Sequence, residues 1–231
     1  MKKTYFNWST GKDSALALHT ILNQHQFSID KLVTTVNESF ERVSMHGVPE
    51  KLLEKQAESI GIPLRKIYIP RDVSMQQYNE IMLKYTRKLV AEGYEYSVFG
   101  DIFLDDLKEY REKQLSEVNL KAVFPLWKRD TKEIMEEFIS SGFKAVSVCV
   151  NANLLGERFV GREINQDFVN DLPQNVDVCG ENGEFHTFVY DGPIFSNPIK
   201  FKLGGKVLKS YKTDDKDTWD SRFWYCDLLT E

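Results

Sequence analysis

The sequence contains few cysteines. Cys149, Cys179 and Cys226 are the three in 231 residues, and they lie far apart. They form no C-x-x-C pair, and no histidine stands at zinc-ligand spacing from them. The sequence therefore predicts neither a disulfide framework nor a structural metal site, and it favours reduced thiols in a cytoplasmic protein.

Long apolar runs and an excess of basic charge are also absent. No stretch approaches the roughly 18 apolar residues that a membrane-spanning helix needs, and the first residues, MKKTYFNWSTGKDS, lack the apolar core of a signal peptide. The formal net charge is -5, and the basic residues are scattered. We therefore expect a soluble protein that does not contact membranes, and the composition gives no general electrostatic reason for nucleic-acid binding.

What the sequence does contain, up to about residue 125, is an alternation of strand-like and helix-like segments. Strands are predicted at residues 5–8, 32–36, 65–69, 96–100 and 122–124, and helices at 14–23, 49–60, 74–91 and 105–118. This alternation predicts an α/β fold in which helices flank a parallel sheet on both faces. Ligands of such sheets bind at the carboxyl ends of the strands, where the strand order reverses.

The remainder of the chain has a different pattern. It predicts a helix at 132–141, a strand at 145–150, irregular sequence to about residue 193, and strands at 199–208 and 222–228. We therefore predict a nucleotide-binding domain at 1–127 and a second, smaller α+β domain at 128–231. No Gly/Ser-rich linker separates them, so we expect the two parts to pack closely.

Residues 9–14, between the first predicted strand and helix, read Ser-Thr-Gly-Lys-Asp-Ser. A turn into a helix N-terminus is a ready anion site, because unpaired backbone N–H groups and the positive end of the helix dipole point to one place. An ordinary strand-to-helix turn capped by serine or aspartate also explains such a pattern. A Walker P-loop is excluded, because Phe6 and Asp13 stand where it needs Gly and Ser or Thr.

The pattern resembles the S-G-G-x-D-S loop of the ATP pyrophosphatases, which cleave ATP between the α and β phosphates. Thr10 stands where that family usually has glycine. Either its Cβ crowds the phosphate or its hydroxyl contacts the ligand, and the sequence leaves both alternatives open. A carboxylate beside phosphate oxygens is tolerable if Mg²⁺ lies between them, so the resemblance implies a metal ligand at Asp13.

Two later segments carry further polar residues. Gly100 and Asp101 follow the fourth predicted strand, at the expected ligand edge of the sheet. The stretch 180–195, GENGEFHTFVYDGPIF, supplies Glu181, Asn182, Glu184 and His186. A hairpin rich in turn residues accounts for this stretch about as well as a functional site does.

Together these segments resemble the diphthine–ammonia ligase family, whose members have a HUP-type, adenine nucleotide α-hydrolase-like fold. The likeness covers essentially the whole chain. It rests on STGKDS, MHGVP at 45–49, GDI at 100–102, Arg111, PLW at 125–127, LLGERFVGREI at 154–164 and GENGEFHTFVYDGP at 180–193. The last segment is close to the family's G-E-x-G-E-F-x-T signature. The MHGVP and GENGEFHT forms are more similar to bacterial relatives, which cannot use the elongation-factor substrate of the family.

The resemblance implies an ATP-dependent amide ligase, in which a carboxylate attacks the α phosphate, pyrophosphate leaves and ammonia displaces AMP. It implies that the protein binds ATP, Mg²⁺, ammonium and a carboxylate-bearing acceptor. It does not identify the acceptor, and it leaves open whether the protein forms a homodimer. ATP-binding roles fall on Ser9, Thr10, Gly11, Lys12, Asp13, Ser14, Gly100 and Asp101. Catalytic roles fall on Lys12, Asp13, Glu181 and Glu184, and substrate-binding roles on His46, Asn182 and His186.

Two alternatives remain. An ATP pyrophosphatase that modifies tRNA shares the loop, but thiolation usually needs a cysteine pair near the site, and none is evident. A nucleotide-binding regulatory module without chemistry has no need of an acidic cluster at 181–184. If this cluster faces residues 9–14 it favours the ligase, whereas an outward-facing cluster favours the regulatory module.

Overall fold

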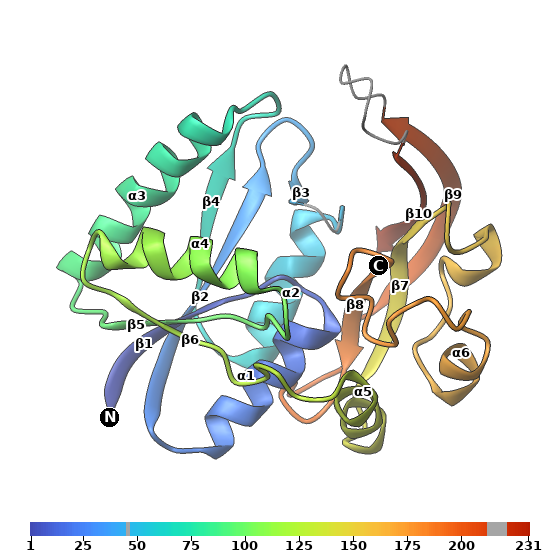
Figure 1. The fold of residues 1–231 in the computed structure, drawn as a ribbon, viewed down its shortest axis with the longest axis horizontal. Helices are drawn as coiled ribbons and strands as arrows, with labels where there is room; N and C mark the ends of the chain where they lie inside the picture. Colours follow the sequence, from blue (N-terminus) through green and yellow to red (C-terminus); the bar gives the residue numbers. More distant parts are fainter. Residues whose placement is uncertain (45–46, 212–220) are drawn as a thin grey trace.

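Two β-sheets organise the chain in this computed structural model, which describes residues 1–44, 47–211 and 221–231 (Figure 1). The first sheet contains β1 (Lys2–Asn7), β2 (Phe27–Asn37), β3 (Arg42–Val43), β4 (Leu64–Ile69), β5 (Tyr96–Val98) and β6 (Lys121–Val123). The second contains β7 (Lys144–Asn151), β8 (Phe185–Asp191), β9 (Phe201–Tyr211) and β10 (Ser221–Thr230). His46, a predicted substrate-binding residue, lies outside the described residues.

The helices begin and end close to where local signals predict. They are α1 (Lys12–Asn23), α2 (Glu50–Ile60), α3 (Met75–Ala91), α4 (Asp105–Ser116), α5 (Thr131–Ser140) and α6 (Gln166–Asn170), with a 3-10 turn η1 (Glu157–Phe159). Gly61, in the left-handed conformation, ends α2, and Ser74 begins α3 with a capping box to Gln77. Within the described residues, no helix is long and apolar enough to cross a membrane.

The first sheet has the parallel strand order β4-β2-β1-β5-β6, and the short β3 adds an antiparallel pair at the end of β2. The chain runs from β1 outward through β2 to β4 and then returns to β5 on the other side of β1. The strand order therefore reverses between β1 and β5. This arrangement confirms the predicted parallel sheet and brings the segments after these two strands to one point.

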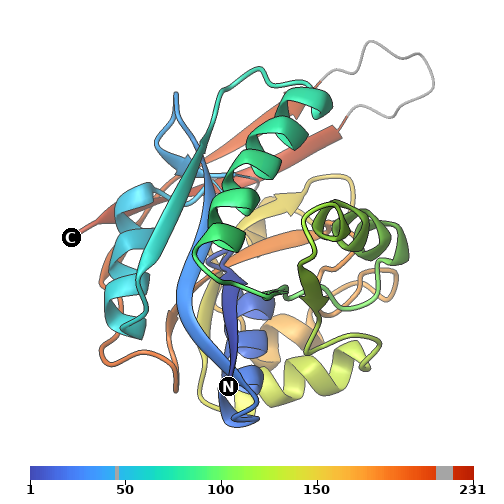
Figure 2. The same ribbon diagram turned by 90° about the vertical axis from the view of Figure 1, so that its left-hand side faces the viewer.

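Helices cover both faces of this sheet. Phe6 and Leu32 point into a cluster with α1 and α2, whereas Tyr5 and Val33 point into a separate cluster with α3 and α4. The opposite assignment of neighbouring residues follows from the two-residue period of a strand. In Figures 1 and 2 the pair α3 and α4 lies on the side of the first sheet that faces away from the second sheet.

The second sheet is antiparallel, with the order β8-β7-β10-β9. One buried apolar cluster joins Phe6 and Leu16 of the first part to Phe138, Val148 and Phe188 of the second, so the two parts pack closely. The outer strand β9 pairs with β10 on one side and forms an edge of the sheet.

The expectation of irregular sequence up to residue 193 was wrong for β8. The segment FHTFVYD forms a strand that pairs with β7. Its aromatic and β-branched residues favour strand, but the flanking Gly180, Gly183 and Gly192 suggested turns. All three glycines have positive φ, so the turn chemistry is real and lies outside the strand.

Gly100 brings the end of β5 against the β1–α1 loop. A Cβ at this position would lie 3.0 Å from the Asp13 carbonyl carbon and 3.0 Å from the Ser14 nitrogen. Both atoms belong to backbone and cannot rotate away. The close approach of two backbone segments at the point of strand reversal therefore requires glycine.

We expect Gly100→Ala to lower the free energy of unfolding by about 1–3 kcal/mol, the usual cost of overpacking. Gly156→Ala is the matched control, because a Cβ there meets nothing within 4 Å and its φ of -73° suits alanine. The control should be neutral or gain up to about 1 kcal/mol from the reduced entropy of the unfolded chain. Urea unfolding of both variants checks this, and equal stabilities would refute the close approach.

Candidate functional site

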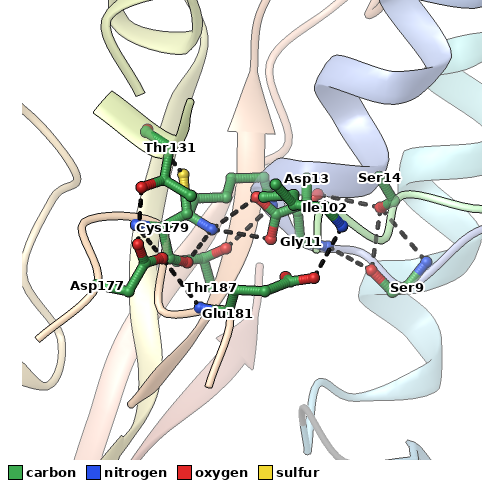
Figure 3. A network of polar contacts seen from close by, with 11 residues as sticks. Ser9, Gly11, Asp13, Ser14, Ile102, Thr131, Asp177, Cys179, Glu181 and Thr187 are labelled. Atoms are coloured by element: carbon green, nitrogen blue, oxygen red, sulfur yellow. Dashed lines mark hydrogen bonds and ion pairs between the residues drawn. The ribbon is translucent and has the colours of Figure 1, made fainter. Parts of the chain in front are cut away.

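The β1–α1 loop lies at the point where the strand order reverses, and it leads directly into α1. Gly11 is the residue before α1 and supplies no side-chain cap, whereas Asp130 caps α5 with two hydrogen bonds. Within the loop the Ser9 hydroxyl donates to Ser14 Oγ at 3.0 Å, and Ser14 Oγ donates to the Gly11 carbonyl at 3.0 Å (Figure 3). The two serines thus link the two ends of the loop, and the positive end of α1 is left without a cap from its own sequence.

Strand β8 of the second sheet contacts this loop directly. The Lys12 N–H donates to Thr187 Oγ1 at 3.0 Å, and the Val189 N–H donates to the Thr10 carbonyl at 3.0 Å. Thr187 is the threonine of the signature segment. The signature therefore contributes a side chain that holds the first residue of α1.

Lys12 is 3% exposed and points toward the second part of the chain. Its Nζ donates to Asp13 Oδ1 at 2.7 Å, to Asp13 Oδ2 at 2.8 Å and to the Cys179 carbonyl. Burial lowers the pKa of Lys12, but the Asp13 carboxylate and other neighbours raise it more, so the amine stays charged. The ammonium group therefore links the loop to the segment before the signature.

Glu181 approaches the loop from the acidic stretch. Its Oε1 accepts a hydrogen bond of 2.8 Å from the N–H of Ile102, the residue after Asp101. Burial, followed by the charge of Asp13, raises the pKa of Glu181 to about 7. Figure 3 shows Glu181 directed toward Ile102 beside the β1–α1 loop. The acidic stretch thus faces the loop at this residue.

Asp177 was missed by the sequence analysis, although it shapes the same segment. Its Oδ1 accepts from the N–H of Cys179 at 3.0 Å and of Glu181 at 3.3 Å, and its Oδ2 accepts from Thr131 Oγ1 at 2.7 Å. An aspartate that bonds the N–H two residues on is an Asx turn. The signal in the sequence was the aspartate itself, because the N–H two residues on is a backbone group.

Glu184 and Asn182 contact each other rather than the loop. Glu184 is 2% exposed, and its Oε1 accepts from the Asp177 N–H at 3.0 Å and from Asn182 Nδ2 at 3.1 Å. Its Oε2 has no hydrogen-bond partner among the described residues. Glu184 therefore supports the turn that carries Glu181. The catalytic role of Glu184 and the substrate-binding role of Asn182 stay predictions.

Asp101 and His186 are two further predicted site residues. Asp101 forms an ion pair with Arg111, with Nε–Oδ2 at 2.8 Å and Nη2–Oδ1 at 3.1 Å, and the guanidinium lies 4.3 Å from the ring centre of Phe99. His186 precedes Thr187 on β8, and burial, followed by the charge of Lys12, lowers its pKa to about 4. His186 is therefore neutral at neutral pH.

Thr10 has an uncommon backbone conformation. Its φ is 74°, in the left-handed region that glycine adopts freely and a β-branched residue adopts with strain. The residue is fully buried, and its hydroxyl has no hydrogen-bond partner among the described residues. The glycine of the related loop pattern is thus replaced by a residue that has to be held in a glycine-like conformation.

Family models match both parts of the chain. The models of the diphthamide synthase N-terminal and C-terminal domains match residues 1–122 and 130–228. A diphthine–ammonia ligase of Danio rerio is 28% identical over 169 residues, which cover 67% of this chain and 66% of that protein. The Homo sapiens protein of the same name is 32% identical over 130 residues, covering 53% of this chain and 49% of that protein. The chain thus covers less than two thirds of either relative.

A solved structure described as a predicted subunit of tRNA methyltransferase from Methanocaldococcus jannaschii aligns with a TM-score of 0.41 and 17% identity. The alignment covers 65% of this chain and 78% of that chain.

The raised pKa of Glu181 predicts a pH dependence of stability. Between pH 4.5 and about 7 the folded protein binds more protons at Glu181 than the unfolded chain, so its stability falls as pH rises through this window. Glu181→Gln keeps the acceptor for Ile102 and removes the titration. Urea unfolding in EDTA without nucleotide should show the wild type losing stability relative to the variant between these pH values. A difference that does not change with pH would contradict this prediction.

Proposed function

Because the chain belongs to the diphthamide synthase family, we propose that it is an ATP-dependent ligase that joins ammonia to a carboxylate and releases AMP and pyrophosphate. The relatives' name, diphthine–ammonia ligase, favours diphthine as the acceptor. The observation that carries the proposal is that the signature segment contacts both sides of the strand reversal. Thr187 accepts from the Lys12 N–H at the start of α1, and Glu181 accepts from the Ile102 N–H after β5. We also propose that the parts at 1–127 and 128–231 act as nucleotide-binding and acceptor-binding domains.

The loop and the start of α1 would bind the phosphates of ATP. Backbone N–H groups and the dipole of α1 favour anions there, and Lys12 adds a buried positive charge next to them. In the ion pair of Lys12 and Asp13, Asp13 is the more accessible residue, with 28% of its side chain exposed. We place the pyrophosphate beside α1 and the reacting α phosphate toward Asp101 and Glu181.

The donor set fits Mg²⁺ bound together with ATP. Among the described residues, no group of three or more His, Cys, Asp or Glu forms a metal cage. Mg²⁺ rarely uses such a cage and usually takes one or two carboxylates plus substrate phosphates. Asp13 fits this role, because each of its oxygens accepts from Lys12 and keeps a further lone pair. The ion would neutralise the charge that develops on the departing pyrophosphate.

Glu181 is the best-placed group to receive ammonium. With a pKa near 7 it is partly ionised at neutral pH, so it can hold ammonium as a carboxylate and accept one of its protons. The neutral ammonia left behind can then attack the acyl carbon of the adenylate. A regulatory module without chemistry gives no reason for a carboxylate with such a pKa beside the loop.

The test of this function is a coupled assay for pyrophosphate and AMP, run with ATP, Mg²⁺, ammonium and either diphthine-containing protein or small carboxylates. Release of both products that depends on the acceptor and on ammonium supports the ligase. Pyrophosphate release with RNA alone supports tRNA modification instead. ATP binding without turnover on any acceptor supports the regulatory module.

Asp13→Asn should lower pyrophosphate release about 10- to 100-fold, a loss typical of disturbing the surroundings of a metal site. Asp167→Asn is the control, because Asp167 is an exposed aspartate in the first turn of α6. Thermal melting separates loss of function from loss of fold. An Asp13 variant with wild-type turnover would exclude this residue from catalysis.

Glu181→Gln should keep ATP binding and lower ammonium-dependent AMP formation by roughly 10²–10⁴-fold, the usual effect of losing a general base. Titration calorimetry with ATP and the coupled assay measure the two effects separately. If the variant instead loses ATP binding and keeps its turnover number, Glu181 binds nucleotide rather than ammonium.

A further inference from the structure

Gln56 is a fully buried polar residue in a helix that otherwise buries apolar side chains. It is 0% exposed, and its buried neighbours on α2 are Leu52, Leu53 and Ala57. A buried amide costs free energy unless its donors and acceptor are paired, so a residue of this kind in an apolar face needs a reason.

All three hydrogen bonds of this amide leave its own helix. Oε1 accepts from Trp8 Nε1 at 2.9 Å, and Nε2 donates to the Val189 carbonyl at 2.6 Å and the Thr10 carbonyl at 3.2 Å. The partners fix the orientation of the amide, because an indole N–H can only donate and carbonyls can only accept. One side chain thus joins the end of β1, the loop and β8.

The peptide that Gln56 holds belongs to Thr10, the residue with the strained backbone. The Thr10 carbonyl accepts from Gln56 Nε2 and from the Val189 N–H, one donor from each flanking element. A strained conformation such as the φ of 74° at Thr10 persists only when its surroundings impose it. These two hydrogen bonds act directly on the strained residue.

We propose that Gln56 is a positioning residue that holds the β1–α1 loop in its phosphate-binding conformation by fixing the Thr10 carbonyl against the second sheet. The hold on the loop follows from the hydrogen bonds alone, and its effect on ATP rests on the proposed function. Gln56 touches no reacting group, so its loss should weaken ATP binding more than it slows the reaction of bound ATP.

The test uses Gln56→Met, which nearly preserves shape and removes all three hydrogen bonds. We expect ATP affinity, measured by calorimetry with Mg²⁺, to fall about tenfold, equivalent to about 1.4 kcal/mol. In the coupled assay the KM for ATP should rise by a similar factor, with kcat within about twofold. Ser147→Ala is the control, because Ser147 is 0% exposed and its hydroxyl donates to the Phe159 carbonyl, outside the loop. It should lower stability and leave ATP affinity unchanged.

A rescue separates positioning from ordinary packing. Glycine adopts a φ of 74° without strain, so Thr10→Gly placed in the Gln56→Met background should restore ATP affinity to within about threefold of the wild type. If Gln56→Met alone does not fold, the double variant has to fold. An unfolded double variant, or losses that simply add, would overturn the proposal.

Hydrogen exchange in the absence of ATP tests the hold on the loop independently of function. Amides of residues 8–14 and of Val189 should exchange faster in Gln56→Met than in the wild type or in Ser147→Ala. Unchanged exchange overturns the proposal whatever the protein binds. If exchange is faster in Gln56→Met and the wild type itself does not bind ATP, the hold on the loop is supported and the proposed function is refuted.

Discussion

The hydrogen bond from the Val189 N–H to the Thr10 carbonyl joins the two sheets at the point where the first one reverses its strand order. The loop conformation depends on it, since Thr10 has no local reason to adopt a positive φ. The neighbouring bond from the Lys12 N–H to Thr187 ties the first residue of α1 to the same strand. Residues almost 180 positions apart therefore set the geometry of one short turn.

The same junction governs the electrostatics. Lys12 is buried between its own neighbour Asp13 and a carbonyl from the segment before β8. Carboxylates of Asp13 and Glu181 surround this cation, and the Asp177 carboxylate orders the turn that carries Glu181. A buried charge is tolerated only when it is paired and hydrogen-bonded. The charge of Lys12 is therefore stable only while the two parts of the chain stay packed together.

The sequence was sufficient for features that depend on near neighbours. Gly61 and Ser74 mark helix ends, and the alternating segments predicted the parallel sheet, so the loop and Gly100 were expected at one edge. The family assignment was confirmed. Reasoning from the sequence failed for β8, because the glycines that flank this strand are typical of a loop. It also failed for Gln56, because a glutamine on an amphipathic helix normally faces solvent. In the second part of the chain Lys12 bonds the Cys179 backbone carbonyl, which no residue identity reveals.

The outer strand β9 bears on how copies of this chain meet one another. Its free edge carries Lys202, Lys206 and Lys209, all exposed, and Gly204 and Gly205 interrupt its side-chain pattern. Strands with these residues are poor templates for edge-to-edge addition, because lysine has to be desolvated and like charges meet when two copies pair antiparallel. The same strand also exposes Leu203, Val207 and Leu208, so its lysines oppose the edge-to-edge pairing that these apolar side chains would favour.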